Sequence, residues 1–437
     1  MKVRTRFSLE KEGFNTGYAP LCVLGEAIYE QKTLHKLREY DLIGVKHHDH
    51  PPGEKLMDAL LLIMSGYGGL NQINTTLRSD QMVGQSWHRE AGLAEQSNIS
   101  RTLDACGEKA VAGLEKLSHE FWKRHSCLEN HDRRKPLVAD LDLSPLVAGR
   151  KAEGSTKGRF EKKNQRGRQL ARVMLYGYRE SILSQLYPGN QHSTHCLEAA
   201  VLGFEKLLKW EGKKQIRVIW RLDGGFGADK NINWLAGRGY DFVVKGGSSP
   251  RAAMLARQVK RWIRVRDDMW VGRVATPKNV KYDVETFSMR YLTRKGPKHS
   301  YLFSTLGFSG RKTLVFYNLR GGAETEFRTD KSGGFFLQKR RKQKFLAQVV
   351  WVILTDMAHN YISWFRHHIL ADSPFANWGA LRIGRDLFRI PGHVEMSSDG
   401  VLSVSLLETH PYAADLLPCL ARFCEWNPPY FAHSFFE

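Results

Sequence analysis

Three consecutive apolar runs in the middle of the chain constrain its fold more than any other feature. They occupy residues 136–148, 170–178 and 181–190. Basic or turn-forming residues separate the runs, and the sequence PGN ends the third. Runs of this kind are typical of successive antiparallel strands, so we expect a sheet to begin near Lys135.

The pattern then changes to alternating helices and strands. Residues 195–210 place apolar side chains at helical spacing, and residues 215–226 have the composition of a buried strand. A second helix and a second strand are expected at 231–240 and 241–246. Three strands followed by helix, strand, helix and strand predict an α/β domain with a mixed sheet flanked by helices.

The flanking segments differ from this middle part. Residues 54–80 and 97–125 predict helices, the second with an N-cap at Ser97 or Ser100. The sequence SNISRTLD suits a helix-turn-helix reader of DNA, and an ordinary helical bundle is an equal alternative. Between 269 and 306 the apolar residues alternate as in strands, and the apolar stretch 312–319 also predicts a strand.

The charge of the chain favours a polyanionic partner. Lys and Arg number 66 and Asp and Glu 45, so the net charge is 66 − 45 = +21. The excess lies in the middle of the chain, since residues 245–300 hold fourteen basic and four acidic residues, whereas residues 401–437 hold one arginine and four acids. Such a distribution indicates nucleic acid binding.

The same sequence gives no sign of export or of a membrane span. The six cysteines form no CxxC pair, so neither a zinc ribbon nor a disulfide framework is expected. No apolar run is long enough to cross a bilayer, and the first residues lack the apolar core of a secretory signal. We therefore expect a cytoplasmic protein.

Two aspartates lie where predicted strands can bring them together. Asp142 belongs to the first strand, within the sequence DLDLS, and Asp223 ends the strand that follows the first helix. Gly224 and Gly225 allow a sharp turn beside Asp223. Carboxylates at the ends of adjacent strands, joined by a third, make an all-oxygen site suited to Mg²⁺ or Mn²⁺. A turn-capping Asp223 and a surface Asp142 are the alternative.

A four-residue signature adds a third carboxylate. Tyr317, Arg320, Glu324 and Lys331 have the spacing Y-x2-R-x3-E-x6-K. With Asp142 and Asp223, this pattern resembles the DDE transposases of bacterial insertion sequences that carry the YREK signature. Further landmarks of such transposases are similar to the segments at 66–81, 187–192, 221–227, 239–246 and 345–366.

The resemblance implies an RNase H-like catalytic core interrupted by a β-rich insertion between the second Asp and the Glu. That gap is 324 − 223 = 101 residues long. The domains expected on this basis are an N-terminal helical DNA-binding domain, the first part of the core, the insertion, and the second part of the core with a C-terminal extension. Their bounds are 1–133, 134–245, 246–310 and 311–437.

The resemblance also implies that Asp142, Asp223 and Glu324 are catalytic and hold Mg²⁺ or Mn²⁺, as two ions. Asp140 is an alternative first ligand within DLDLS, and Glu326 lies close to Glu324. We prefer Asp142 because the family usually has a hydroxyl residue two positions later, and Ser144 stands there.

The implied function is transposition. The protein would bind the terminal inverted repeats of its element as a dimer on double-stranded DNA, cleave the ends and join them to target DNA near the bacterial nucleoid. A transposase-derived regulator without catalysis and a structure-specific nuclease of the RNase H type are the alternatives. Residues expected to contact DNA are Tyr317, Arg320, Lys331, Trp270, Lys339, Arg340 and Arg341.

Trp270 is expected to act together with Trp262. Both tryptophans lie among basic residues of the insertion. Aromatic rings interleaved with cations suit stacking on an unpaired base near the cleaved end. Burial of both rings between the insertion and the core is an equal alternative.

Overall fold

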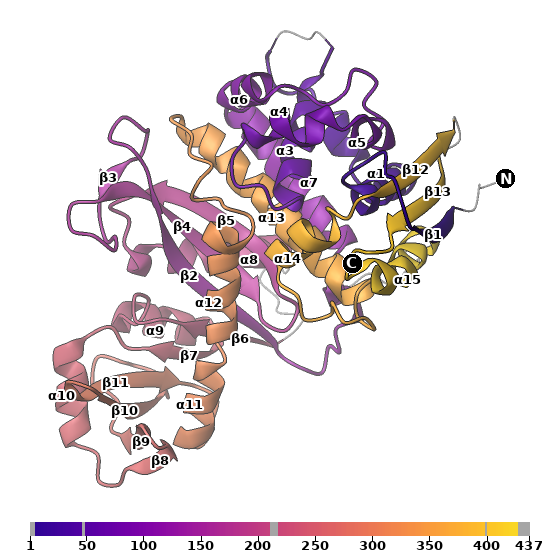
Figure 1. Ribbon diagram of the computed structural model, residues 1–437. Helices are drawn as coiled ribbons and strands as arrows, with labels where there is room; N and C mark the ends of the chain where they lie inside the picture. The colour runs from indigo at the N-terminus through magenta and orange to yellow at the C-terminus, as the bar shows by residue number, and fades with distance from the viewer. Residues whose placement is uncertain (1–4, 46–48, 210–216, 398–399, 427–437) are drawn as a thin grey trace.

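The structure is a computed structural model, and it describes residues 5–45, 49–209, 217–397 and 400–426 (Figure 1). A helical part occupies the top of the view, the central sheet crosses the middle, and a lobe built on β8 to β11 lies below. Among the described residues no helix is both long and apolar enough to cross a bilayer. All six cysteines are free.

The central sheet begins with three antiparallel strands. β2 (Leu137–Val147) pairs with β4 (Arg166–Leu175), which pairs with β5 (Glu180–Pro188) and with the short β3 (Thr156–Lys157). These strands coincide with the three apolar runs. The prediction of successive antiparallel strands is therefore confirmed.

Two parallel strands complete the core of this sheet. β6 (Val218–Leu222) lies parallel to β2, and β7 (Asp241–Lys245) lies parallel to β6. The helices α8 (Leu197–Leu207) and α9 (Asp229–Gly237) precede these strands and bury their apolar residues against the sheet. The spatial order β5-β4-β2-β6-β7 confirms the expected RNase H-like mixed sheet.

The β-rich segment continues the same sheet. After α10 (Ser249–Arg257), the hairpin of β10 (Glu285–Thr293) and β11 (Gly296–Ser304) pairs with β7 through β11. The strands β9 (Met269–Val274) and β8 (Ile263–Arg266) add the outer edge. The lobe at the bottom of Figure 1 is thus an extension of the sheet beyond β7.

The strand expected at 312–319 is wrong, because the structure forms a helix there. α11 (Gly310–Asn318) has Ser309 as its N-cap, and the Ser309 side chain accepts a hydrogen bond from the Lys312 backbone N–H. Apolar residues are equally compatible with a short helix, and a capping serine favours the helix. The chain continues through α12 (Gly321–Arg328) and a single wide turn, η4 (Thr329–Gly333).

Helices predominate among the described residues before His131, as expected, although β1 (Arg6–Glu10) is a strand. The described helices are α1 (Ala19–Glu30), α2 (His35–Arg38), α3 (Pro52–Met64), α4 (Gln72–Thr75), η1 (Leu77–Ser79), α5 (Gln81–Ser86), α6 (Gln96–Asp104), α7 (Glu108–Arg124) and η2 (Cys127–Asn130). The serine cap expected for α6 is wrong, because the helix begins one residue before Ser97, with Glu95 at the N-cap. The cysteine and glycine at 106–107 separate α6 from α7.

This helical segment shares one core with the C-terminal part of the chain. β1 (Arg6–Glu10) pairs with β13 (Gly400–Leu407), which pairs with β12 (Gly392–Ser397). The helix α13 (Phe345–His368) packs against α3, α7 and β5. The elements that complete this core are α14 (Ala380–Arg382), η5 (Ile383–Leu387) and α15 (Ala413–Glu425). The short η3 (Ser193–His195) lies outside it and precedes α8.

A truncation in α13 tests this shared core. Leu354 is fully buried and belongs to the same apolar cluster as the N-terminal helices. We expect Leu354→Ala to lower the free energy of unfolding by about 2–5 kcal/mol, because it leaves a cavity between the N-terminal helices and the C-terminal part of the chain. Urea denaturation followed by circular dichroism measures this. Val315→Ala, at an exposed position of α11, is the control and is expected to change stability little.

Candidate active site

The side chains of Asp140 and Asp142 lie on the same face of β2, because residues two apart in a strand point the same way. Asp140 pairs in register with Arg221 of β6, and both side chains are fully buried. Arg221 donates from Nε and Nη2 to the two Asp140 oxygens, at 2.9 and 2.6 Å. Its Nη1 donates to the Phe316 carbonyl oxygen of α11. Both carboxylate oxygens of Asp140 are therefore occupied by a buried ion pair with Arg221.

Asp142 is oriented differently, since it reaches the surface. Its side chain is 21% exposed, and its Oδ1 accepts a hydrogen bond from Arg320 Nη2 at 2.8 Å. The Ser144 hydroxyl donates to Oδ2 at 2.9 Å. The hydroxyl residue two positions after the aspartate thus orients this carboxylate.

Asp223 follows the last residue of β6 and lies on the same side of the sheet as Arg221. Its Oδ1 accepts a hydrogen bond from the Gly225 backbone N–H at 2.9 Å. A side chain at Gly225 would collide with Ser193 Oγ, so the tight turn requires glycine. Burial raises the pKa of Asp223; the charge of Arg320 opposes this shift and the charge of Asp142 adds to it. Asp223, Asp142 and Arg320 therefore act on one another electrostatically.

Glu324 enters the same group from the first turn of α12. Its Oε1 lies 2.5 Å from Arg320 Nη1, and its side chain is 62% exposed. Arg320 itself is buried and bridges Glu324 to Asp142. Glu326 points elsewhere, because it lies 3.5 Å from Arg179 at the turn between β4 and β5.

The structure thus brings Asp142, Asp223 and Glu324 together around one guanidinium. Burial lowers the pKa of Arg320, but the charges of Asp142, Tyr317 and Asp223 outweigh this and the net shift is upward. The Arg320 Nε has no hydrogen-bond partner among the described residues. Three carboxylates around one arginine leave negative charge in excess, and a hard divalent cation fits an all-oxygen set of this kind.

Lys245, the last residue of β7, was not among the residues predicted for the site. Burial and the charge of Lys298 lower its pKa, whereas the carboxylates of Asp223 and Glu324 raise it. Lys245 therefore lies within electrostatic reach of two of the three carboxylates. The available signal was its position, since β6 and β7 are parallel and end at the same edge of the sheet.

The residues expected to bind DNA lie in different environments. Tyr317 is partly buried beside Arg320, and burial raises the pKa of its hydroxyl. Lys331 lines a small hollow with Ser144 of β2, close to Asp142. Arg320 points at carboxylates, as described above.

The basic run at 339–341 divides between the surface and the interior. Lys339 and Arg341 are exposed. Arg340 is 3% exposed, donates to the Tyr67 carbonyl oxygen and lies over the Trp351 ring. Burial lowers the pKa of Arg340 to about 9. The structure places Arg340 inside the helical core, so its side chain is not on the described surface.

The two tryptophans of the lobe are neither fully buried nor free on both faces. Trp262 and Trp270 are partly exposed. The Arg290 guanidinium lies 4.9 Å from the centroid of the first ring and 4.7 Å from that of the second. Each ring thus has one face covered by a cation.

The helix expected to read DNA is engaged with the core on one side. Lys342 Nζ donates to Ser100 Oγ at 2.7 Å and to Asp104 Oδ2 at 2.6 Å, both on α6. Arg101 is the exposed side chain of this helix. Recognition of DNA by α6 stays a prediction.

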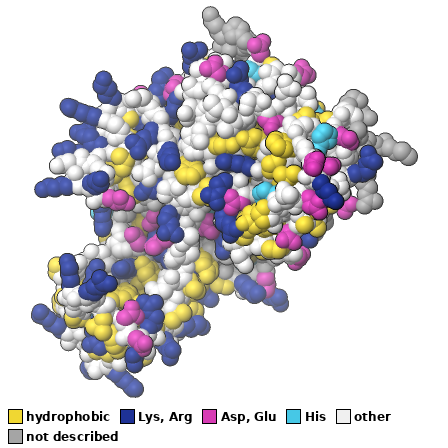
Figure 2. All heavy atoms as spheres, in the orientation of Figure 1, with side chains coloured by type: hydrophobic (Ala, Val, Ile, Leu, Met, Phe, Trp, Pro, Cys, Tyr) yellow, Lys and Arg dark blue, Asp and Glu magenta, His cyan; other side chains and the backbone are white. Residues whose placement is uncertain are grey.

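Lys and Arg are concentrated on two parts of the visible surface, and Asp and Glu lie between these parts as well as elsewhere on this face. Figure 2 shows Lys and Arg gathered on the outer side of the region of β3 and β4 and on the lower lobe, with Asp and Glu between them. An acidic group between two basic surfaces is the distribution expected where a polyanion crosses a site of metal-binding carboxylates.

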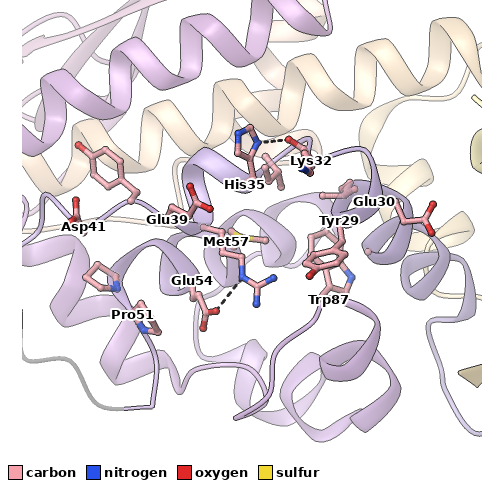
Figure 3. Close-up of a pocket in the computed structure, with 16 residues that line it drawn as sticks. Tyr29, Glu30, Lys32, His35, Glu39, Asp41, Pro51, Glu54, Met57 and Trp87 are labelled. Carbon is pink, nitrogen blue, oxygen red and sulfur yellow. Dashed lines mark hydrogen bonds and ion pairs between the residues drawn. The ribbon is translucent and has the colours of Figure 1, made fainter. Parts of the chain in front are cut away.

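A larger hollow lies away from these carboxylates. Residues of α1, α2 and α3 line a pocket of about 700 Å³, with Tyr29, Met57 and Trp87 on its walls (Figure 3). The acids on its rim are Glu30, Glu39, Asp41 and Glu54. Glu54 accepts a hydrogen bond from Arg38 at 3.3 Å. So many acids make the pocket a poor site for a phosphate backbone.

One further group has metal-binding side chains. The ligand atoms of Cys127, His367 and His368 lie within 4.8 Å of one another. Burial and the neighbouring Glu180 raise the pKa of the Cys127 thiol. Because a metal binds the thiolate, this environment disfavours a metal site.

A mixed sheet flanked by helices, with Asp142 of β2, Asp223 after β6 and Glu324 of α12 gathered on one side, is the arrangement expected of a DDE-type transposase domain. The family model described as Transposase DDE domain group 1 matches residues 44–427, so the chain belongs to that family. Among solved structures it is similar to piggyBac transposase in a synaptic complex with hairpin DNA, at 13% identity and a TM-score of 0.48. That match covers 85% of this chain and 79% of the other. No curated protein matches the chain.

The two aspartates of β2 are expected to respond differently to neutralisation. Asp140→Asn leaves Arg221 buried without its partner and is expected to cost about 3–5 kcal/mol of stability. Asp142→Asn is expected to cost much less, because Arg320 keeps Glu324 and the repulsion of Asp223 is relieved. Urea denaturation of both variants makes the comparison. Equal losses would mean that Asp142 is as much a structural residue as Asp140.

Proposed function

We propose that this protein is a DNA transposase that cleaves the ends of its element and joins them to target DNA. Membership of the DDE family supports a transposase that acts on DNA. The observation that carries the proposal for this chain is the meeting of Asp142, Asp223 and Glu324 around Arg320. The three carboxylates come from β2, the end of β6 and α12, which lie far apart in the sequence.

In this proposal Asp142, Asp223 and Glu324 hold Mg²⁺ or Mn²⁺, as two ions. Bound divalent cations would activate the attacking oxygen and stabilise the leaving one. Arg320 keeps the carboxylates together until a cation binds. Asp140 has no part in this set, because Arg221 occupies both of its oxygens.

Basic side chains and a tyrosine would hold the DNA. Lys245 and Tyr317 lie within electrostatic reach of the carboxylates, Lys331 shares a small hollow with Ser144, and Lys339 and Arg341 are exposed. They would orient the scissile phosphate so that a water or a 3′-hydroxyl attacks phosphorus while the bond to the leaving oxygen breaks. Arg320 would reach phosphate only after it releases a carboxylate.

The wider features of the proposal follow the resemblance to bacterial insertion-sequence transposases. The substrates are the terminal inverted repeats of an element and a target duplex, and two protein copies act on paired ends. The site of action is the cytoplasm, at the nucleoid. The basic surfaces on both sides of the acidic group support DNA as the partner.

Strand transfer with labelled element ends separates this proposal from its alternatives. The transposase is expected to cut the end and to join the freed 3′ strand to a target duplex in the presence of Mg²⁺. A transposase-derived regulator would bind the end without cutting it. A nuclease of the RNase H type would cut without joining.

Replacement of Glu324 by Gln tests the metal role directly. The amide keeps the size of the side chain but not the charge that holds a cation, so cutting and joining are expected to fall by orders of magnitude. Binding of DNA is expected to persist, because the lysines and arginines are unchanged. Cleavage of a labelled end and a gel shift measure the two properties.

Glu326→Gln is the matched control for this test. Its carboxylate is two residues away on the same helix but lies beside Arg179. We expect near-normal cutting. An inactive Glu326 variant beside an active Glu324 variant would show that the signature is read in the wrong register, and activity in both would refute the proposed site.

We also propose that Trp270 stacks on an unpaired base near the cleaved end, with Arg290 against its other face. Stacking of this kind contributes about 1–3 kcal/mol per base. Trp270→Ala is therefore expected to weaken binding of an end with unpaired terminal bases by that amount, and to change binding of a fully paired end little. Equal losses for both DNAs would contradict the stacking.

A further inference from the structure

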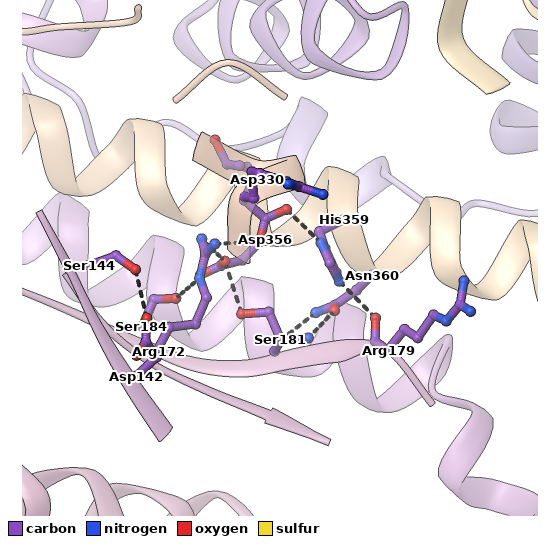
Figure 4. A network of polar contacts seen from close by, with 12 residues as sticks. Asp142, Ser144, Arg172, Arg179, Ser181, Ser184, Asp330, Asp356, His359 and Asn360 are labelled. Atoms are coloured by element: carbon purple, nitrogen blue, oxygen red, sulfur yellow. Dashed lines mark hydrogen bonds and ion pairs between the residues drawn. The ribbon is translucent and has the colours of Figure 1, made fainter. Parts of the chain in front are cut away.

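A buried network of charges fixes the far end of α12 to the sheet. Figure 4 shows Arg172 of β4 among carboxylates that reach it from η4 and α13. Arg172 Nη1 donates to Asp330 Oδ2, and Nη2 donates to Asp356 Oδ1 at 2.6 Å. Its Nε donates to Ser184 Oγ of β5 at 2.9 Å. Arg172, Asp330 and Asp356 are all buried.

The same carboxylate of Asp330 has a second partner. His359 Nδ1 donates to Asp330 Oδ1 at 2.6 Å, and His359 Nε2 donates to the Arg179 carbonyl oxygen at 2.7 Å. Both acceptors are satisfied only when both ring nitrogens carry protons. Burial lowers the pKa of His359, but the charge and hydrogen bond of Asp330 outweigh this, so the pKa is raised. Glu326 also raises this pKa, and Arg172 lowers it.

The network adjoins the candidate site through the sheet. Arg172 is the register partner of Asp142 across β2 and β4, so both side chains lie on one face. Asp330 lies six residues after Glu324, beyond a helix of eight residues. The η4 turn is held by backbone hydrogen bonds from Phe335 to Thr329 and from Leu337 to Asp330. Arg320 at one end of α12 and Asp330 at the other are therefore its buried polar anchors.

The Glu324 side chain has few contacts of its own, since it is mostly exposed and contacts Arg320. When a cation takes the carboxylates of Asp142 and Glu324, the bridge through Arg320 weakens. The later part of α12 must then hold the helix, where Phe327 is buried beside Met174 of β4 and Glu326 lies 3.5 Å from Arg179. Asp330, just beyond this part, adds the buried charged contacts.

We propose that Asp330, clamped between Arg172 and His359, is the positioning residue that sets α12 against β2 so that Glu324 faces Asp142. This inference rests on the proposed function, since it assumes that the three carboxylates hold a cation. Asp330 touches none of the three carboxylates and acts through the helix.

The affinity for Mn²⁺ without DNA reports this role. Free Mn²⁺ measured by electron paramagnetic resonance gives the dissociation constant of the purified full-length protein. Asp330→Asn is expected to weaken Mn²⁺ binding about 10-fold, as outer residues that orient metal ligands commonly do. Glu324→Gln, which loses a ligand, sets the reference for a damaged site.

Two substitutions of His359 separate its two hydrogen bonds, one to Asp330 and one to the Arg179 carbonyl oxygen. The amide nitrogen of Asn falls near the position of Nδ1, so His359→Asn keeps the hydrogen bond to Asp330. The amide nitrogen of Gln falls near Nε2, so His359→Gln keeps the contact with the Arg179 carbonyl oxygen and loses Asp330. We expect His359→Gln to weaken Mn²⁺ binding and His359→Asn to stay near wild type. This pair retains its meaning even where Asp330→Asn fails to fold.

The chain offers a matched control for general loss of stability. Asp58 of α3 is equally buried and accepts hydrogen bonds from Arg89 at 3.1 and 3.3 Å. It lies in the helical part and contacts neither α12 nor η4. Asp58→Asn is expected to lower the melting temperature without changing the affinity for Mn²⁺.

The outcomes separate the inference from the function on which it rests. The positioning role alone is overturned if Glu324→Gln weakens Mn²⁺ binding while Asp330→Asn and His359→Gln leave it unchanged. An equal loss in Asp58→Asn overturns it as well, because the effect would be one of stability. A wild-type protein that binds no Mn²⁺, or a Glu324→Gln variant that binds it normally, overturns the proposed carboxylate site itself.

Discussion

The guanidinium of Arg320 is the contact on which the candidate site depends. It is buried at the start of α12, donates to Asp142 and Glu324, and acts electrostatically on Asp223. Without a cation there, three carboxylates from β2, the end of β6 and α12 would repel one another. The strand order places the first two side by side, because β2 and β6 are neighbouring parallel strands. Arg320 also binds the third carboxylate, Glu324, which lies 324 − 223 = 101 residues after Asp223.

Charge balance distinguishes this group from the buried charges around it. On one side, Asp140 and Arg221 form a closed pair. On the other, Arg172 and His359 balance Asp330 and Asp356. Between them, Asp142, Asp223 and Glu324 share Arg320, with Lys245 nearby. Buried charges are normally paired, so an excess of carboxylates at a partly exposed position indicates a site for a further cation.

Much of this arrangement could be predicted from the sequence, because it depends on local patterns. Apolar runs and turn residues located β2, β4, β5, β6 and β7. The spacing of the signature located Glu324 and Arg320, and the hydroxyl at Ser144 favoured Asp142 over Asp140. The stretch 312–319 was misjudged because its apolar residues suit a strand as well as a helix, and the deciding cap at Ser309 lies outside it.

Long-range contacts set the limit of such predictions. In the basic run at 339–341 the three side chains look alike in sequence, yet Arg340 is buried against Tyr67 and Trp351 while its neighbours are exposed. Lys245 and Asp330 were missed for a related reason. Lys245 lies in a segment noted only as a landmark, and Asp330 falls in the unspecified gap between Glu324 and Lys331. The role proposed for each depends on partners from other strands or helices, which the sequence does not show.

The two anchors of α12 also explain how a short helix can hold the Glu324 carboxylate beside Asp142. A helix of eight residues with two glycines at its start has little stability of its own. Here Arg320 holds the first turn to β2 and Asp330 holds the turn after the last to β4 and α13. β2 and β4 are register partners at Asp142 and Arg172, so both anchors attach to the same place in the sheet. Both anchors, with the buried Phe327 between them, hold α12 against the sheet while the Glu324 side chain stays exposed.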